Sequence, residues 1–158
     1  WLAPDWLGRR LVDLVGQDIA GQLSTLASGV RSRMLEQPVA GRTERFDALI
    51  RSVAAIRDRH PGLRLVIAGE GTERPLLEAE IDRLGAGDWI SLPGRVTDEE
   101  IVDLYRRAWL VAASSAVEGW GMTLTEAAAC GTPAVATRTT GHLDAVVDGT
   151  TGLLAASD

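Results

Sequence analysis

The pattern of apolar and polar positions from residue 46 onward predicts alternating helices and strands. Apolar residues recur at helical spacing between 46 and 56, and Pro61-Gly62 ends that helix. Further helices are expected at 74–84, at 98–108, after Gly121 and at 142–147. Almost wholly apolar runs at 63–68, 89–92, 109–113 and 133–137 are typical of buried strands. This order predicts an α/β, Rossmann-like fold in which these four strands are neighbours in one parallel sheet, with helices on both faces.

Glycine-containing turns follow each predicted strand, at 69–71, 93–95, 114–121 and 137–141. The carboxyl ends of parallel strands meet at one edge of a sheet, where such folds bind ligands. Glycine lets backbone N–H groups approach a ligand, and the helix that begins after Gly121 offers free N–H donors to an anion. A turn between strand and helix also needs glycine for its geometry alone. For any single turn, a role in ligand binding and a role in turn geometry alone both remain open.

The segment from 114 to 137 places two carboxylates around a glycine turn. Glu118 directly precedes Gly119-Trp120-Gly121, and Glu126 follows eight positions after Glu118. Thr123 and Glu126 also have the spacing of a capping box, in which the glutamate only accepts a backbone N–H at the helix start. His142, after the 133–137 strand, fits a surface loop better than a ligand site.

Composition narrows the function classes. The 158-residue chain is 46% hydrophobic, which is enough for one domain with a real core, and its net charge of −6 argues against nucleic acid as a partner. All 16 basic residues are arginines. The single Cys130 excludes an internal disulfide and a cysteine-based zinc site, and it fits a reducing cytosol.

The run EGWGMTLTEAAACGTPAVAT, residues 118–137, resembles the signature of the GT-B retaining glycosyltransferases known as family 4. The family pattern pairs two glutamates as E-x7-E, and the glycines and the proline fall in register with it. LRLVIAGEGTER and ISLPGRVTDEEIVDLYRRA resemble the strands and turns upstream, and TTGHLDAVVDGTTGLL resembles the tail of the pattern. The resemblance covers about residues 44–155 in order, and it is far more specific than one glycine motif.

The resemblance implies the C-terminal, nucleotide-sugar-binding half of a two-domain transferase, with no metal ion and no cofactor. Glu126 would bind the ribose hydroxyls, and Glu118 would contact the donor sugar near the reacting carbon as a catalytic residue. The remaining donor-binding residues implied are Gly71, Arg95, Val96, Gly119, Gly121, Met122 and Thr123. Of these, the backbone at 121–123 would hold the diphosphate, and Arg95 and Val96 would lie near the base.

The chain departs from the family pattern before residue 46. The family places an arginine and a lysine after its first strand, to neutralise the leaving diphosphate. Here Gly41-Arg42 has no apolar strand before it, and Glu44 stands near the expected lysine. Arg42 or Arg45 could take this catalytic role, and Arg42 is the candidate named here, although a guanidinium does not simply replace an ammonium.

The domain boundaries follow from the same comparison. Residues 1–38 are expected to be a helical remnant, the end of an acceptor domain in the resemblance, and 39–158 a nucleotide-sugar-binding domain shortened at its C-terminal end. The chain starts with Trp1 and is interpreted as a fragment.

Two functions are therefore open. The chain is part of a retaining glycosyltransferase that uses a nucleotide-diphosphate sugar, or it is an inactive module that only binds the donor. A dinucleotide-dependent oxidoreductase is weaker, because GEGTER lacks the third glycine of that motif. The acceptor is not identified by the sequence, and peripheral membrane contact through the missing acceptor domain stays open.

Overall fold

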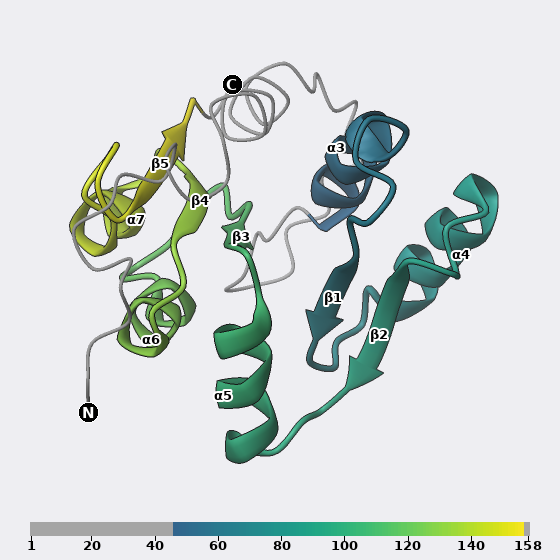
Figure 1. Ribbon diagram of the computed structural model, residues 1–158, viewed down its shortest axis with the longest axis horizontal. Helices are drawn as coiled ribbons and strands as arrows, with labels where there is room; N and C mark the ends of the chain where they lie inside the picture. Colours follow the sequence, from purple (N-terminus) through teal and green to yellow (C-terminus); the bar gives the residue numbers. More distant parts are fainter. Residues whose placement is uncertain (1–45, 157–158) are drawn as a thin grey trace.

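A computed structural model describes residues 46–156, so the predictions for residues 1–38, Arg42 and Glu44 lie outside the described residues. Helices and strands alternate in it as the sequence predicts (Figure 1). The elements are α3 (Phe46–Arg57), β1 (Leu65–Ala68), α4 (Arg74–Leu84), β2 (Ile90–Gly94), α5 (Asp98–Arg107), β3 (Val111–Ala113), α6 (Met122–Cys130), β4 (Ala134–Thr137), α7 (Thr140–Ala145) and β5 (Gly152–Ala155). The predicted α/β, Rossmann-like class is confirmed.

The strands form two parallel sheets rather than the single predicted one. β1 pairs with β2, and β3, β4 and β5 pair in that order. The expectation that all four predicted strands would be hydrogen-bonded neighbours is therefore wrong at one junction: within 46–156, β1 and β3 are not paired with each other. The two edges face a common cavity instead.

Local sequence explains how several elements begin and end. Gly85 ends α4 in the left-handed conformation, with φ of 60°. At α5, the Thr97 hydroxyl accepts the Glu100 N–H, and the Glu100 carboxylate accepts the Thr97 N–H, which completes a capping box. In β2, Pro93 has no N–H to donate, and the pairing with β1 shifts by one residue beside it.

Each sheet has its own hydrophobic core. The first joins α3, α4 and β2 through Ile50, Leu77, Ile81, Ala86 and Ile90. The second lies around β4 through Leu124, Ala134, Ala136, Val146 and Leu154. α5 packs against α6, and α6 packs against α7, so these helices form a layer with the second sheet.

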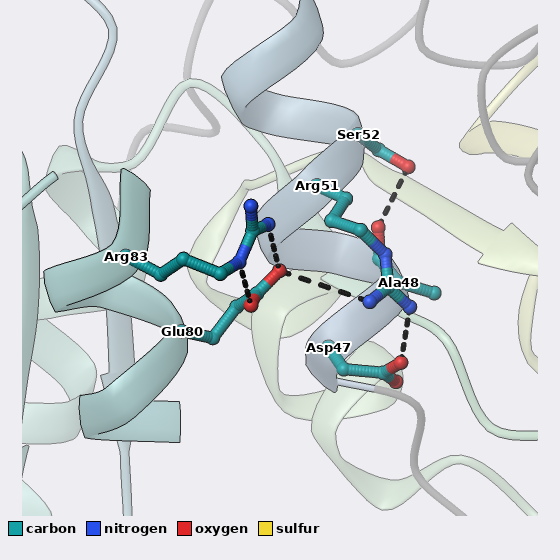
Figure 2. A network of polar contacts seen from close by, with 6 residues as sticks. All are labelled: Asp47, Ala48, Arg51, Ser52, Glu80 and Arg83. Atoms are coloured by element: carbon teal, nitrogen blue, oxygen red, sulfur yellow. Dashed lines mark hydrogen bonds and ion pairs between the residues drawn. The ribbon is translucent and has the colours of Figure 1, made fainter. Parts of the chain in front are cut away.

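A polar network joins α3 to α4 above the first core (Figure 2). Glu80 on α4 accepts two hydrogen bonds of 2.8 Å from Arg83, and its carboxylate also lies 3.7 Å from the Arg51 guanidinium on α3. The hydrogen bond from Arg83, together with the charges of Arg83 and Arg51, lowers the pKa of Glu80 despite partial burial. Arg51 also pairs with Asp47 one turn away on its own helix. Within this network, the pair of Arg51 and Glu80 links the two helices.

Candidate functional site

The candidate site lies where β3 and β4 end, in the loop that leads from β3 to α6. The Thr137 hydroxyl at the end of β4 donates to the carbonyl of Ser115, just beyond the end of β3. Ser115 is 2% exposed, so the base of the loop is buried. From this base the chain emerges to the surface at Ala116 and Val117, and Glu118 is half-buried.

The Glu118 carboxylate is held by the backbone of its own loop. One oxygen accepts the Gly119 N–H at 3.0 Å and the Trp120 N–H at 3.5 Å, and the other accepts the Ser115 hydroxyl at 3.5 Å. Partial burial raises the pKa of Glu118, but the backbone N–H groups of residues 119–121 outweigh it and hold the pKa below its ordinary value. Glu118 is therefore an ionised group at neutral pH.

Gly141 fixes the position of this loop. Its N–H donates to the carbonyl of Glu118 at 3.1 Å. A side chain at this position would place Cβ 2.6 Å from the carbonyl carbon of Gly119 and 2.6 Å from the nitrogen of Trp120. We call the loop from β3 to α6, residues 114–121, the glutamate loop. The start of α7 thus lies against the backbone of this loop, and only glycine permits that approach.

The N-terminus of α6 is open to an anion. The residue before the helix, Gly121, has φ of 78°, and no side chain caps the helix. Its carbonyl accepts the N–H groups of Leu124 and Thr125, so those of Met122 and Thr123 have no acceptor inside the helix. Both residues are exposed. Free N–H groups and the positive end of the helix dipole together favour a negatively charged ligand.

A hydrogen bond from helix α5 holds the Glu126 carboxylate. The Tyr105 hydroxyl of α5 donates to one Glu126 oxygen at 3.0 Å, while the glutamate itself is exposed on α6. Tyr105 is 6% exposed, and its carbonyl accepts the hydroxyl of Thr132. Burial, followed by the bond to Glu126, raises the pKa of the Tyr105 phenol, so it stays a donor. Because no side chain caps α6, the capping-box interpretation of Thr123 and Glu126 is wrong.

His142 is buried, which corrects the expectation of a surface loop. It is 1% exposed and its Nδ1 lies 2.7 Å from the Thr137 carbonyl. Its ring lies beneath Gly121, where a Cβ would come within 3.1 Å of His142 Cδ2. Tyr105, Thr137 and His142 support the site, and sequence reasoning assigned none of them to it. The only available signal was the apolar spacing that placed Tyr105 on the inner face of its helix.

The remaining predicted residues lie apart from the glutamate loop. Gly71 follows β1, and Arg95 and Val96 follow β2, so these three belong to the carboxyl edge of the first sheet. Arg95 is exposed and has no hydrogen bond or ion pair with another described residue. By contrast, Arg74 is engaged by Glu70, Glu78 and the carbonyl of Leu92. The structure brings together Glu118, Gly119, Gly121, Met122, Thr123 and Glu126.

Two kinds of feature are absent from the part of the chain that the structure describes. No group of three or more histidine, cysteine, aspartate or glutamate side chains is arranged to hold a metal ion there. None of its helices combines the length and the apolar character needed to cross a bilayer.

Residues 38–158 match the protein family described as Glycosyl transferases group 1. D-inositol 3-phosphate glycosyltransferase from Corynebacterium jeikeium is 38% identical over 149 residues, covering 88% of this chain and 36% of the relative. A putative glycosyltransferase, EpsD, from Bacillus subtilis is 37% identical over 106 residues, covering 67% of this chain and 27% of the relative. The chain thus spans about a third of the length of the curated relatives that it matches.

Solved structures show the same likeness. The pneumococcal O-GlcNAc transferase GtfA, in complex with UDP and GlcNAc, superposes with a TM-score of 0.67 at 28% identity, over 73% of this chain and 22% of that one. Anabaena HepE in complex with UDP-glucose superposes with a TM-score of 0.58 at 29% identity, over 66% of this chain and 30% of that one.

Adding a methyl group at Gly141 should disrupt the glutamate loop. In Gly141→Ala the new Cβ meets backbone atoms that cannot rotate away, so we expect the free energy of unfolding to fall by about 1–3 kcal/mol. Gly62→Ala is the matched control, because nothing lies within 4 Å of a Cβ there. Urea unfolding of both variants measures the difference. Equal stability of the two would show that the loop does not depend on this contact.

The Glu118 carboxylate should make stability depend on pH. Its pKa is lower in the folded than in the unfolded chain, so its contribution is complete above the unfolded value, about 4.3, and is lost as the pH falls through the folded value. We expect Glu118→Gln to lower the free energy of unfolding at pH 7 and to approach the parent at acidic pH. Asp88→Asn, at an exposed turn, is the control. A Glu118→Gln deficit that stays constant from pH 7 to pH 3 would contradict this account.

Proposed function

Because the chain belongs to the Glycosyl transferases group 1 family, we propose that it is the donor-binding part of a retaining, family 4 type glycosyltransferase that uses a nucleotide-diphosphate sugar. The observation that carries the proposal is the uncapped N-terminus of α6 between two carboxylates. An anion at this N-terminus would have Glu118 on one side and Glu126 on the other. A nucleotide-sugar has this order of groups: a sugar, a diphosphate and a ribose.

The diphosphate binds at the start of α6 in this proposal. The N–H groups of Met122 and Thr123 point out of the first turn, and the left-handed backbone of Gly121 directs the chain into the helix. Backbone N–H groups can bind phosphate without a charged side chain, and the basic residues of this chain are all arginines. These N–H groups bind phosphate oxygens without ordering a long side chain.

Glu126 binds the ribose in this proposal. It lies one turn into α6, about 6 Å along the axis from Met122 at 1.5 Å per residue. The Tyr105 hydroxyl occupies one of its oxygens at 3.0 Å and leaves the other to accept hydroxyl hydrogens from the ligand. A carboxylate fixed by a buried phenol loses little side-chain entropy on binding.

Glu118 faces the sugar. Its ionised carboxylate accepts backbone N–H groups at 3.0 and 3.5 Å now, and it retains lone pairs for sugar hydroxyls. Negative charge beside the carbon that leaves the diphosphate stabilises the positive charge that develops there in the transition state. Glu118 would act as a catalytic residue in this sense.

The nucleotide base is placed at the edge of the first sheet. Arg95 and Val96 follow β2 and Gly71 follows β1, so all three lie at the carboxyl edge of the first sheet. Complexes of GtfA with UDP and of HepE with UDP-glucose make a uridine nucleotide the first to test. The D-inositol 3-phosphate glycosyltransferases among the relatives make a sugar alcohol phosphate one acceptor class to screen.

The acceptor half is proposed to come from outside this domain, because the relatives are about three times as long as the matched segment. Contact with a membrane surface, if the whole protein makes one, is assigned to that half. A cytoplasmic location is proposed on the single free cysteine, Cys130.

The two glutamates should have separable effects on binding. Glu126→Ala should weaken UDP and UDP-glucose binding alike, by about 1.5–3 kcal/mol, because a charged hydrogen-bond acceptor is lost. Glu118→Ala should spare UDP and reduce the preference for UDP-glucose over UDP. Isothermal titration calorimetry with both ligands measures the two effects.

Asp88→Ala is the control for this experiment, because Asp88 precedes β2 and so lies at the opposite edge of the sheet. If Glu126→Ala bound both ligands as tightly as the parent, this result would show that Glu126 does not bind the ribose. GDP and ADP titrations in parallel identify the base.

The alternative function, donor binding without catalysis, makes a different prediction for turnover. Arg42 is the one cation proposed for the leaving diphosphate, and Glu44 stands two residues away with the opposite charge. We expect the 158-residue chain to bind UDP weakly and to release almost no free glucose from UDP-glucose. Robust hydrolysis or transfer by this chain, abolished in Arg42→Ala, would overturn that expectation and establish the clamp.

A further inference from the structure

A single phenol connects helix α5 to the second glutamate of the site. Tyr105 is the one tyrosine of the chain and is 6% exposed, whereas Glu126 on α6 is exposed. The Tyr105 hydroxyl lies 3.0 Å from a Glu126 carboxylate oxygen. Among residues 46–156, this is the one hydrogen bond that the Glu126 carboxylate makes. An exposed glutamate otherwise changes rotamer freely, so the buried ring limits where this carboxylate lies.

The backbone of Tyr105 is fixed as well. Its carbonyl accepts the Ala108 N–H at 3.2 Å and also the hydroxyl of Thr132, a residue that is 4% exposed. Thr132 follows α6, and its own N–H donates to the Ala127 carbonyl at 2.9 Å. Buried side chains on a fixed backbone occupy few rotamers, so the phenol hydroxyl is held at one place beside α6.

The direction of the hydrogen bonds around this hydroxyl follows from its chemistry. An ionised carboxylate only accepts, so the single O–H of Tyr105 donates to Glu126, and the phenolic oxygen can accept in turn. Burial first, and then the hydrogen bond and charge of Glu126, raise the pKa of Tyr105, while a hydrogen bond with the Thr123 side chain lowers it. A bond that lowers the pKa is one donated to the phenolic oxygen, because it stabilises the anion. Hydrogen bonds therefore run from Thr123 through Tyr105 to Glu126.

A carboxylate held in place discriminates between ligands more strongly than a mobile one. A site built to bind a ligand hydroxyl rejects the analogue without it, because the polar group of the site is then left unpaired. A glutamate that turns freely into water escapes that penalty, since water replaces the missing hydroxyl. A glutamate whose carboxylate is tied to a buried phenol turns away less easily. The hydroxyl of Tyr105 therefore bears on how well Glu126 can distinguish one nucleotide from another.

We propose that Tyr105 is a positioning residue that makes donor binding selective for ribonucleotides over 2′-deoxyribonucleotides. This inference rests on the proposed function, in which Glu126 binds the ribose. Tyr105 acts through Glu126 and does not touch the ligand. Without the phenol hydroxyl, Glu126 keeps its charge and its place on α6, but its carboxylate has no hydrogen-bond partner among residues 46–156 and is free to turn into solvent.

Tyr105→Phe tests this role, because it removes the hydroxyl and keeps the ring. Isothermal titration calorimetry of the 158-residue chain with UDP and with 2′-deoxy-UDP gives the ratio of the two dissociation constants. We expect the parent to prefer UDP. We expect Tyr105→Phe to lower that preference by about threefold to tenfold, the range that one hydrogen bond supplies, and to change the affinity for 2′-deoxy-UDP little.

Thr132→Val is the matched control. It removes a buried hydroxyl that binds Tyr105 at its carbonyl, and that carbonyl keeps the Ala108 N–H. A contact that only joins α5 to α6 would lower stability in both variants and weaken both nucleotides equally. We therefore expect Thr132→Val to keep the ratio of the parent. A loss of preference in Thr132→Val as large as that in Tyr105→Phe would overturn the inference.

Glu126→Ala separates this inference from the proposed function. If Glu126→Ala loses the preference for UDP and Tyr105→Phe keeps it, the ribose role stands and the positioning role is overturned. If Glu126→Ala itself keeps the preference, the ribose role fails, and this inference fails with it.

The hydrogen bond itself can be measured without a nucleotide. Because the chain has one tyrosine, labelling tyrosine with ¹³C at Cζ gives one NMR signal, and that signal reports the hydrogen bonding of Tyr105. We expect the signal to shift in Glu126→Ala and to stay in place in Asp88→Ala, an exposed position before β2. A signal that Glu126→Ala leaves unchanged would show that the phenol does not bind this carboxylate in solution, and it would overturn the inference whatever the nucleotides do.

Discussion

The backbone contact between Gly141 and the loop at Glu118 is the constraint on which the candidate site depends. At this point two connections, one after β3 and one after β4, lie closer than any side chain would allow. The hydrogen bond from the Gly141 N–H to the Glu118 carbonyl fixes the peptide that precedes the glycine turn. The position of the Glu118 carboxylate and the direction of α6 both follow from that peptide. Below it, the buried His142 ring supports Gly121.

The described strands divide into two sheets, and each sheet is stabilised by its own apolar contacts. Each sheet has enough apolar contacts to form a core of its own, one under α3 and α4 and the other around β4. The glutamate loop belongs wholly to the second core, whereas Gly71, Arg95 and Val96 belong to the first. The nucleotide-sugar that we propose would span both sheets, so their relative position decides whether one molecule can reach the proposed base and sugar positions.

The sequence was sufficient for the order of the elements but not for all of their bounds: the strand expected at 63–68 begins at Leu65, and the helix expected at 142–147 spans Thr140–Ala145. It was insufficient for sheet pairing, since apolar runs do not state which edges meet. At the site, the E-x7-E spacing located both glutamates, but the partner of Glu126 lies 21 positions away on another helix. The burial of His142 was also missed, because a histidine after a glycine gives no sign of what packs over it.

The charge balance at the site explains why its geometry rests on the backbone. The chain carries a net charge of −6 and no lysine, and Glu118 is ionised beside the start of α6, so an incoming diphosphate meets repulsion as well as attraction. An anion at the exposed N-terminus of a helix gains about 0.3–1 kcal/mol from the helix dipole, which is modest against the repulsion of one adjacent negative charge. The diphosphate binding that we propose at this edge would therefore be strengthened by a nearby cation. Among the described arginines, Arg138 follows β4 at this edge and pairs with Asp148, whereas Arg74 is engaged by two carboxylates and Arg95 belongs to the other sheet.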